Sequence, residues 1–296
     1  MNASHEFGGN WTDRKVEFLA EYLKAYQTVL KNQSFRTSYV DAFAGTGYRT
    51  ESPKSQASSI PSATDENSVY EEEATDFQKG SAVRALETPI PFDRYVFIEK
   101  KAEHIQELQK LEQQFPDLAN RMFFRRGEAN AELQTWCKAM QRDERAVVFL
   151  DPYGMTVEWR TIEALAQTNK VDLWILFPIG MGINRMLLRS GPPEGAWSDR
   201  ITTVLGTNDW KTAFYQPAAQ TSMLDPNALE KVASFDAIGA FFLNRLRTIF
   251  SDVAPNPYYL RNSKNTPLYL LCFAASNRKG AEIAVRIAKS VLAKKN

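Results

Sequence analysis

Two short runs of apolar residues constrain the fold of this chain more than any other feature. They are "AVVFLD" (146–151) and "VDLWILF" (171–177), and a helical pattern at 158–167 lies between them. A nearly continuous apolar run is typical of a strand that is buried on both faces of a parallel sheet. Further strands are indicated at "TSYVDAF" (37–43), "RYVFIEK" (94–100) and "MFFRRG" (122–127). Because strands alternate with helical patterns, we predict an α/β protein with βαβ units and a mostly parallel sheet.

The other segments suggest a division into three parts. Residues 1–179 form the predicted core, which begins with a helix at 13–31 and contains an acidic, aperiodic loop at 51–79. That loop is either a functional lid or a tolerated insertion. Residues 180–255 are expected to form a helical insertion or lid, and residues 256–296 two strands and a helix that complete the core. The two C-terminal strands are too close in sequence for a parallel crossover, so they must be antiparallel.

Composition narrows the functional classes. The formal net charge of +1 provides no general basic field for nucleic acid, although a local basic face would suffice. Two cysteines, Cys137 and Cys272, cannot form a disulfide framework or a four-thiolate metal site, and both lie in apolar segments typical of core thiols. Two histidines exclude most histidine-based zinc or triad chemistry. The sequence shows no secretory signal and no apolar run of roughly 18 residues, so we expect a cytoplasmic protein.

Each of the first four predicted strands ends in an acidic residue: Asp41, Glu99, Glu128 and Asp151. In an open α/β sheet, ligands bind beyond the carboxyl ends of the strands. The glycines of "GTG" follow Asp41, but the sequence has neither the phosphate-binding G-x-x-x-x-G-K-[ST] motif nor a full G-x-G-x-x-G fingerprint. A site lined by acids suits a ligand with hydroxyls, an amine and a positive centre. S-adenosylmethionine (AdoMet) has all three.

This hypothesis gives each strand end a role. The Gly45–Gly47 backbone approaches the cofactor closely, because glycine has no side chain to prevent it. Asp41 faces the amino-acid end of the cofactor, and Glu99 takes its two ribose hydroxyls. Glu128, with Asn130 nearby, meets the adenine amine.

The same residues also have explanations that need no chemistry. The two glycines could form a tight turn, Glu99 could be a solvated strand end, and Glu128 could cap a helix. Asp151-Pro152 could likewise cap a helix, and Gly80-Ser81 most simply does so. We favour a cofactor site because the strands deliver Asp41, the glycines, Glu99 and Asp151 to one edge of the sheet.

These motifs also carry a resemblance to known proteins. "VDAFAGTG", "FIEK" and "FLDPYG" resemble the glycine loop, the ribose acid and the catalytic loop of Rossmann-like, class I AdoMet-dependent methyltransferases. With "GSAVRAL", "LWILFPIGM" and "PLYLLCFAAS", the chain more narrowly resembles the three-Cys-motif partner protein family, except in the acidic loop and much of 190–250. That resemblance implies a partner protein of the three-cysteine, radical-AdoMet-like kind. The cofactor-binding residues that it implies are Trp11, Lys15, Asp41, Phe43, Ala44, Gly45, Gly47, Glu99, Lys100, Glu128 and Asp151.

The segment Asp151-Pro152-Tyr153-Gly154 resembles the [DNS]-P-P-[YFW] loop of methyltransferases that modify base amines. It implies that Asp151 and the Pro152 carbonyl accept hydrogen bonds from the amine, while Tyr153 stacks on a flipped base. This chain lacks the second proline, so its aromatic residue comes one position early. Three hypotheses follow: a methyltransferase for a nucleic-acid base amine, an AdoMet-binding accessory partner that transfers no methyl group, and a methyltransferase for a small molecule or a protein. No oligomeric state is predicted.

Overall fold

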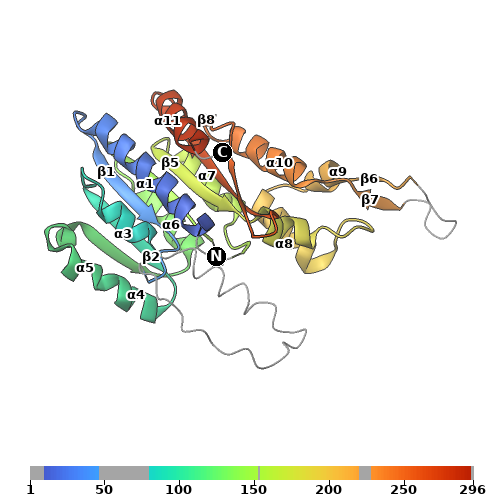
Figure 1. The fold of residues 1–296 in the computed structure, drawn as a ribbon, viewed down its shortest axis with the longest axis horizontal. Helices are drawn as coiled ribbons and strands as arrows, with labels where there is room; N and C mark the ends of the chain where they lie inside the picture. The colour runs from blue at the N-terminus through green and yellow to red at the C-terminus, as the bar shows by residue number, and fades with distance from the viewer. Residues whose placement is uncertain (1–9, 47–79, 153, 220–227, 295–296) are drawn as a thin grey trace, which may run out of the picture. The chain divides into compact units, whose positions relative to one another are not determined.

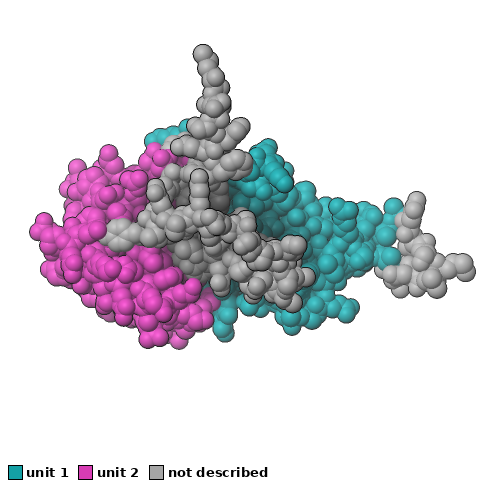
Figure 2. All heavy atoms as spheres, turned by 60° about the horizontal axis from the view of Figure 1, so that its bottom comes forward, with its two compact units in different colours: residues 1–7, 155–296 teal, residues 8–154 magenta. Residues whose placement is uncertain are grey.

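The structure is a computed structural model that describes residues 10–46, 80–152, 154–219 and 228–294, with side chains from Arg14 onward. The acidic loop at 51–79, Gly47, Tyr153 and the side chain of Trp11 therefore lie outside the described residues. The chain divides into two compact units, residues 8–154 and residues 155–296 (Figure 2).

The unit 8–154 is built on a parallel sheet (Figure 1). Its strands are β1 (Arg36–Asp41), β2 (Arg94–Glu99), β3 (Met122–Arg126) and β4 (Glu144–Leu150), in the order β3-β2-β1-β4. All three strand pairs in this unit are parallel, and Tyr39 in the middle of β1 lies beside Tyr95 on one side and Val147 on the other. The α/β fold with a mostly parallel sheet, predicted from the alternation of strands and helices, is confirmed.

Helices join these parallel strands. They are α1 (Asn10–Leu30), α3 (Ser81–Leu86), α4 (Ala102–Gln109), α5 (Leu111–Gln114) and α6 (Ala129–Ala139), with a 3₁₀ helix at Pro116–Arg121 before β3. The apolar residues of α1 recur at helical spacing and are buried, among them Leu19, Tyr22 and Leu23. This burial orients α1 with Lys15 on its inner face.

The unit 155–296 contains an antiparallel arrangement. Strand β10 (Pro267–Ala275) pairs antiparallel with β5 (Val171–Phe177), with the short β8 (Asp252–Val253) and with β9 (Tyr258–Arg261). Helix α7 (Trp159–Gln167) precedes β5, and α11 (Ala281–Ala293) packs on β10. The predicted antiparallel pair near the C-terminus is therefore confirmed, since β9 and β10 are that pair.

The segment between β5 and β8 contains helices and two short strands. It comprises a π-helical turn (Ile179–Asn184), α8 (Gly195–Leu205), α9 (Trp210–Phe214), β6 (Tyr215–Pro217), β7 (Leu229–Lys231) and α10 (Phe235–Arg247). β6 and β7 form a separate antiparallel ribbon, which the sequence did not indicate (Figure 1). At the end of α8, Gly206 has a φ of 69°, and a Cβ there would lie 2.1 Å from the Trp159 ring. Only glycine fits that turn.

The three-part division at 179 and 255 stays a prediction, and the compact units themselves separate near residue 154. None of the helices in the described part of the chain is long and apolar enough to span a membrane. Within the same residues, no group of three or more His, Cys, Asp or Glu side chains is arranged to hold a metal ion.

Candidate functional site

The backbone after β1 runs between the carboxyl ends of two neighbouring strands. The N–H of Ala42 donates to the Phe149 carbonyl of β4 at 3.3 Å, and the N–H of Ala44 donates to the Ile98 carbonyl of β2 at 3.2 Å. Gly45 then takes a left-handed conformation with a φ of 58°, which favours glycine. The first glycine of the motif is therefore required by the backbone. Phe43 and Ala44 are buried within this turn.

Glu99, at the end of β2, is held against the glycine turn. Its Oε2 accepts the N–H of Gly45 at 3.2 Å, and its Oε1 accepts the N–H of Lys101 at 2.8 Å. The side chain is almost fully buried, and His104 Nδ1 lies 3.5 Å from Oε1. An ionised carboxylate has about four acceptor positions, so each oxygen can accept a further hydrogen bond. The two backbone bonds fix the carboxylate in one orientation, which suits a pair of hydroxyl donors.

Asp41, at the end of β1, is completely buried. Its Oδ2 accepts the Ser81 hydroxyl at 2.6 Å and the Tyr39 hydroxyl at 3.3 Å, and its Oδ1 accepts the Phe43 N–H at 3.2 Å. Burial raises the pKa of Asp41 to about 6, although the hydrogen bonds from Ser81, Phe43 and Tyr39 oppose this.

Ser81 is the site residue that sequence reasoning missed. We expected "GS" at 80–81 to cap a helix. Gly80 does occupy the N-cap of α3, but glycine has no side chain that could cap it. The Ser81 hydroxyl instead points to Asp41. The position of "GSAVRAL" soon after the acidic loop could not identify this contact, because the two residues are 40 positions apart.

Lys15 and Asp151 form a buried ion pair. Lys15 comes from α1 and is 0% exposed, and Asp151 follows β4 directly and is 3% exposed. Burial lowers the pKa of Lys15 to about 8, against the opposing attraction of Asp151 and Asp41. Burial also raises the pKa of Asp151, while Lys15 opposes that rise. Both shifts have the same cause, because desolvation disfavours the charged form of either group.

The alternative that Asp151-Pro152 caps a helix is wrong. The next described helix is α7, which begins at Trp159 and has Glu158 at its N-cap. Pro152 is buried directly after Asp151. The strand therefore ends in a buried carboxylate that is paired with a lysine.

The remaining predicted residues are placed differently. Glu128 is exposed and caps α6, accepting the Ala131 N–H at 3.1 Å and the Asn130 amide at 2.9 Å. Glu128 is therefore a helix cap, which is one of the two interpretations that the sequence allowed. Lys100 is exposed beside Glu99. The structure thus brings together Lys15, Asp41, Gly45, Glu99 and Asp151, whereas the Glu128 side chain turns to its own helix.

The two cysteines fit the prediction only in part. Cys272 is fully buried in β10, but Cys137 is half-buried rather than part of the core. Burial raises the pKa of both thiols, to about 12 for Cys137. Neither thiol is a reactive thiolate near neutral pH.

Comparison with known proteins shows the fold. No family model matches the chain, and no curated protein matches it. Among solved structures, a Legionella pneumophila protein of the family DUF519 aligns with a TM-score of 0.52 at 13% identity, covering 96% of this chain and 92% of that one. An O-methyltransferase from Bacillus cereus in complex with SAH gives a TM-score of 0.35 at 12% identity, over 91% of this chain and 93% of the other.

A magnesium protoporphyrin IX methyltransferase from Synechocystis with bound SAH gives a TM-score of 0.36 at 10% identity, over 90% of this chain and 84% of that one. At 13% identity the alignment with the Legionella protein bears on the fold alone, and nothing is argued from the two alignments with TM-scores below 0.5. The resemblance to three-Cys-motif partner proteins rests on the sequence motifs. The chain has a mixed α/β architecture with a mostly parallel sheet, in line with the Legionella protein.

Proposed function

We propose that this protein is an AdoMet-dependent methyltransferase that acts on the amine of a nucleic-acid base. The observation that carries the proposal is the Glu99 carboxylate, held by two backbone N–H groups beside the left-handed Gly45 turn. A fixed, buried carboxylate next to a tight backbone turn suits a diol that lies along the turn. A ribose is such a diol.

The charges of the site favour a cationic ligand. Three carboxyl groups, those of Asp41, Glu99 and Asp151, follow or end neighbouring strands here, and the ammonium group of Lys15 pairs with that of Asp151. A polyphosphate would be repelled from such a set, because phosphate sites use backbone N–H groups and a lysine without neighbouring acids. AdoMet brings a sulfonium cation and an ammonium group, so it would reduce the net negative charge. When bound, it would supply an electrophilic methyl group.

Asp151 is our candidate for the group that receives the acceptor amine. It ends β4, and β4 pairs with β1, so Asp151 lies at the same sheet edge as the glycine turn. Its carboxylate and the Pro152 carbonyl can accept hydrogen bonds from an amine, and Tyr153 is proposed to stack on the base. The nitrogen would form its bond to the methyl carbon as the carbon–sulfur bond breaks, and the nitrogen would then release a proton to water. Holding the amine in line with the sulfur supplies most of the rate enhancement.

One observation favours a second candidate, an AdoMet-binding accessory module. Lys15 already binds the Asp151 carboxylate, which is 3% exposed. If no substrate reaches Asp151, the site would hold the cofactor without transferring its methyl group. The motif resemblance would then imply that the chain serves a partner, a three-cysteine, radical-AdoMet-like protein.

A transfer assay separates these candidates. The protein is incubated with AdoMet labelled in its methyl group and with bulk RNA, bulk DNA, protein extract or small-molecule extract, with and without the candidate partner. We expect label in RNA or DNA, and we expect Asp151→Asn to abolish it. Asp143→Asn is the matched control, because Asp143 is exposed beside the opposite end of β4.

The outcomes point to different functions. Label in protein or small molecules alone would contradict the base substrate and retain a methyltransferase. No label in any pool, together with measurable AdoMet binding, would support the accessory module.

A further inference from the structure

Lys15 is a charged residue whose side chain is fully buried. It is one of the largest fully buried side chains, and its ammonium group has been taken out of water. Removing an ammonium ion from water costs several kcal/mol, by order of magnitude, and a buried ion pair is weak evidence for stability. A hydrophobic residue at the same position of α1 would pack without that cost. The lysine therefore needs a reason other than stability.

The surroundings of Lys15 come from three elements. Asp151 follows β4 and binds the ammonium group directly. Asp41 at the end of β1 attracts it electrostatically. The hydroxyls of Tyr39 of β1 and Ser81 of α3 both donate to Oδ2 of Asp41. Lys15 is the cation among these named groups and faces two buried carboxylates.

We propose that Lys15 is the positioning residue for Asp151, which it holds ionised and in one rotamer for the acceptor amine. This inference rests on the proposed function and adds to it a role that acts through another residue. An ionised carboxylate only accepts hydrogen bonds, whereas a protonated one also donates. An amine that presents N–H groups to Asp151 needs the ionised form. Without a neighbouring cation, a carboxylate buried this deeply would take up a proton instead.

The proposal differs from the role that the sequence suggested for Lys15, which was direct contact with the cofactor. A lysine that acts through Asp151 should matter only while Asp151 is present. A lysine that binds the cofactor should matter whether or not Asp151 is present. A double-variant cycle separates the two cases.

The cycle compares Lys15→Met, Asp151→Asn and the double variant with the wild-type protein. We expect Lys15→Met to lower kcat of methyl transfer about 100-fold, the size of effect that misplacing a reacting group produces. We expect the dissociation constant for AdoMet to change little. In the Asp151→Asn background, in which transfer is already lost, Lys15→Met should have no further effect on AdoMet binding. Equal effects in both backgrounds would overturn the proposal.

A second measurement reads the protonation of Asp151 without any reaction. In protein labelled with ¹³C at the aspartate carboxyl carbon, the chemical shift at pH 7 reports whether each carboxylate is ionised. We expect Asp151 to be ionised in the wild-type protein and protonated in Lys15→Met. The Asp151→Asn variants assign the signal, and Arg36→Met is the control, since its partner Asp143 is exposed. An Asp151 that stays ionised in Lys15→Met would refute the proposal.

These two measurements also separate failure of the inference from failure of the proposed function. If no methyl transfer occurs, the carboxyl signal still decides whether Lys15 keeps Asp151 ionised. If Lys15→Met does not fold, the double variant with Asp151→Asn removes both charges and should fold, because the uncompensated carboxylate is gone. Its AdoMet affinity is then compared with that of Asp151→Asn alone. Weaker binding in the double variant would assign Lys15 to the cofactor and overturn the inference.

Discussion

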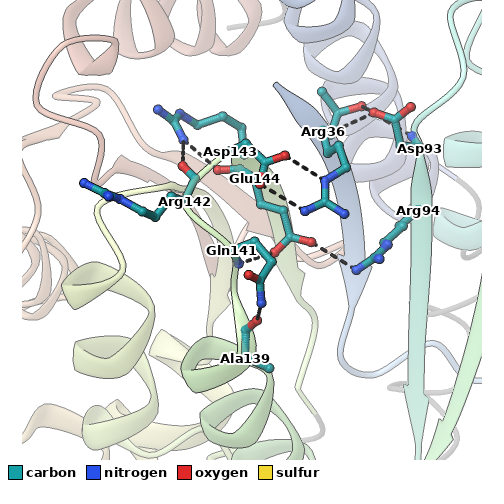
Figure 3. Close-up of polar contacts among 10 residues, drawn as sticks. Arg36, Asp93, Arg94, Ala139, Gln141, Arg142, Asp143 and Glu144 are labelled. Atoms are coloured by element: carbon teal, nitrogen blue, oxygen red, sulfur yellow. Dashed lines mark hydrogen bonds and ion pairs between the residues drawn. The ribbon is translucent and has the colours of Figure 1, made fainter. Parts of the chain in front are cut away.

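The two ends of the parallel sheet in residues 8–154 carry ion pairs that differ in their exposure to water. At the amino ends of the strands, Arg36 binds Asp143 through two hydrogen bonds of 2.9 and 3.0 Å, and both side chains are exposed (Figure 3). Nearby, Arg94 binds Glu144 at 3.0 Å. At the carboxyl ends, Lys15 and Asp151 are paired without access to water.

The pKa shifts follow this difference. The hydrogen bond from Arg36 lowers the pKa of Asp143, whereas burial raises the pKa of Asp151 and Asp41. The Arg36–Asp143 pair joins the starts of neighbouring strands at little cost, because water still solvates both side chains. In the Arg94–Glu144 pair only the arginine is exposed, and the glutamate is buried. The carboxyl-end groups are expensive to bury, and a buried pair adds little net stability. Charges that a chain retains at such a cost are candidates for chemistry.

The largest expected effect comes from breaking the buried pair. Lys15→Met should lower the free energy of unfolding by about 3–5 kcal/mol, because it leaves the Asp151 carboxylate uncompensated. Urea unfolding of the purified variant measures this. The double variant Lys15→Met, Asp151→Leu should recover most of the loss. A double variant as unstable as Lys15→Met alone would show that the pair matters for packing rather than for charge.

Asp41→Asn tests the other buried carboxylate through pH. Because the pKa of Asp41 in the folded protein is about 6, above its ordinary value of 3.8, the native state binds more protons between these pH values. The stability of the wild-type protein relative to Asp41→Asn should therefore fall as pH rises from about 4 to about 6, by about 3 kcal/mol for a shift of roughly two units. Unfolding free energies at several pH values check this.

Asp143→Asn should show the opposite slope. Since the pKa of Asp143 is lowered, its stabilising contribution is present above the ordinary value and is lost as pH falls through the folded value. Equal slopes for the two variants would contradict the contrast between the two ends.

Ser81→Ala removes one donor from Asp41 and should have an intermediate effect. Losing a hydrogen bond to a buried charged group costs about 1–3 kcal/mol. Because that bond opposes the rise in the Asp41 pKa, its loss should raise the pKa further. Calorimetric unfolding and carboxyl chemical shifts measure the two effects. Thr135→Ala serves as the control, since its exposed hydroxyl bonds only within α6. An unchanged Asp41 pKa in Ser81→Ala would show that Ser81 does not hold the carboxylate.

The smallest effect is expected at the amino ends. Arg36→Met should leave the urea midpoint nearly unchanged, because the pair that it breaks is exposed to water on both sides. Adding salt should also change the stability of this variant less than that of the wild-type protein, since salt screens the pair. A loss as large as that of Lys15→Met would remove the distinction between the two ends.

The sequence predicted the strands of the sheet and the residues that end them, because both are local properties. Apolar runs identified β4 and β5. The end of β4 placed Asp151 at a strand terminus, just as the ends of β1 and β2 placed Asp41 and Glu99. The side-chain partners were not predictable in this way. Lys15 and Asp151 are 136 positions apart, and nothing near either residue identifies the other. The ribbon of β6 and β7 was also missed, because strands of three residues are too short to show a period.

Titration calorimetry with AdoMet tests the central claim most directly, namely that the acid-lined sheet edge binds this cofactor. We expect the wild-type protein to bind AdoMet and Glu99→Gln to bind it at least tenfold more weakly, because the amide cannot accept from two hydroxyls. The control is Glu103→Gln, which neutralises an exposed glutamate four residues further along the chain. This variant should bind AdoMet like the wild-type protein. No binding to the wild-type protein at AdoMet concentrations of about 1 mM, a dissociation constant worth about 4 kcal/mol, would contradict the account.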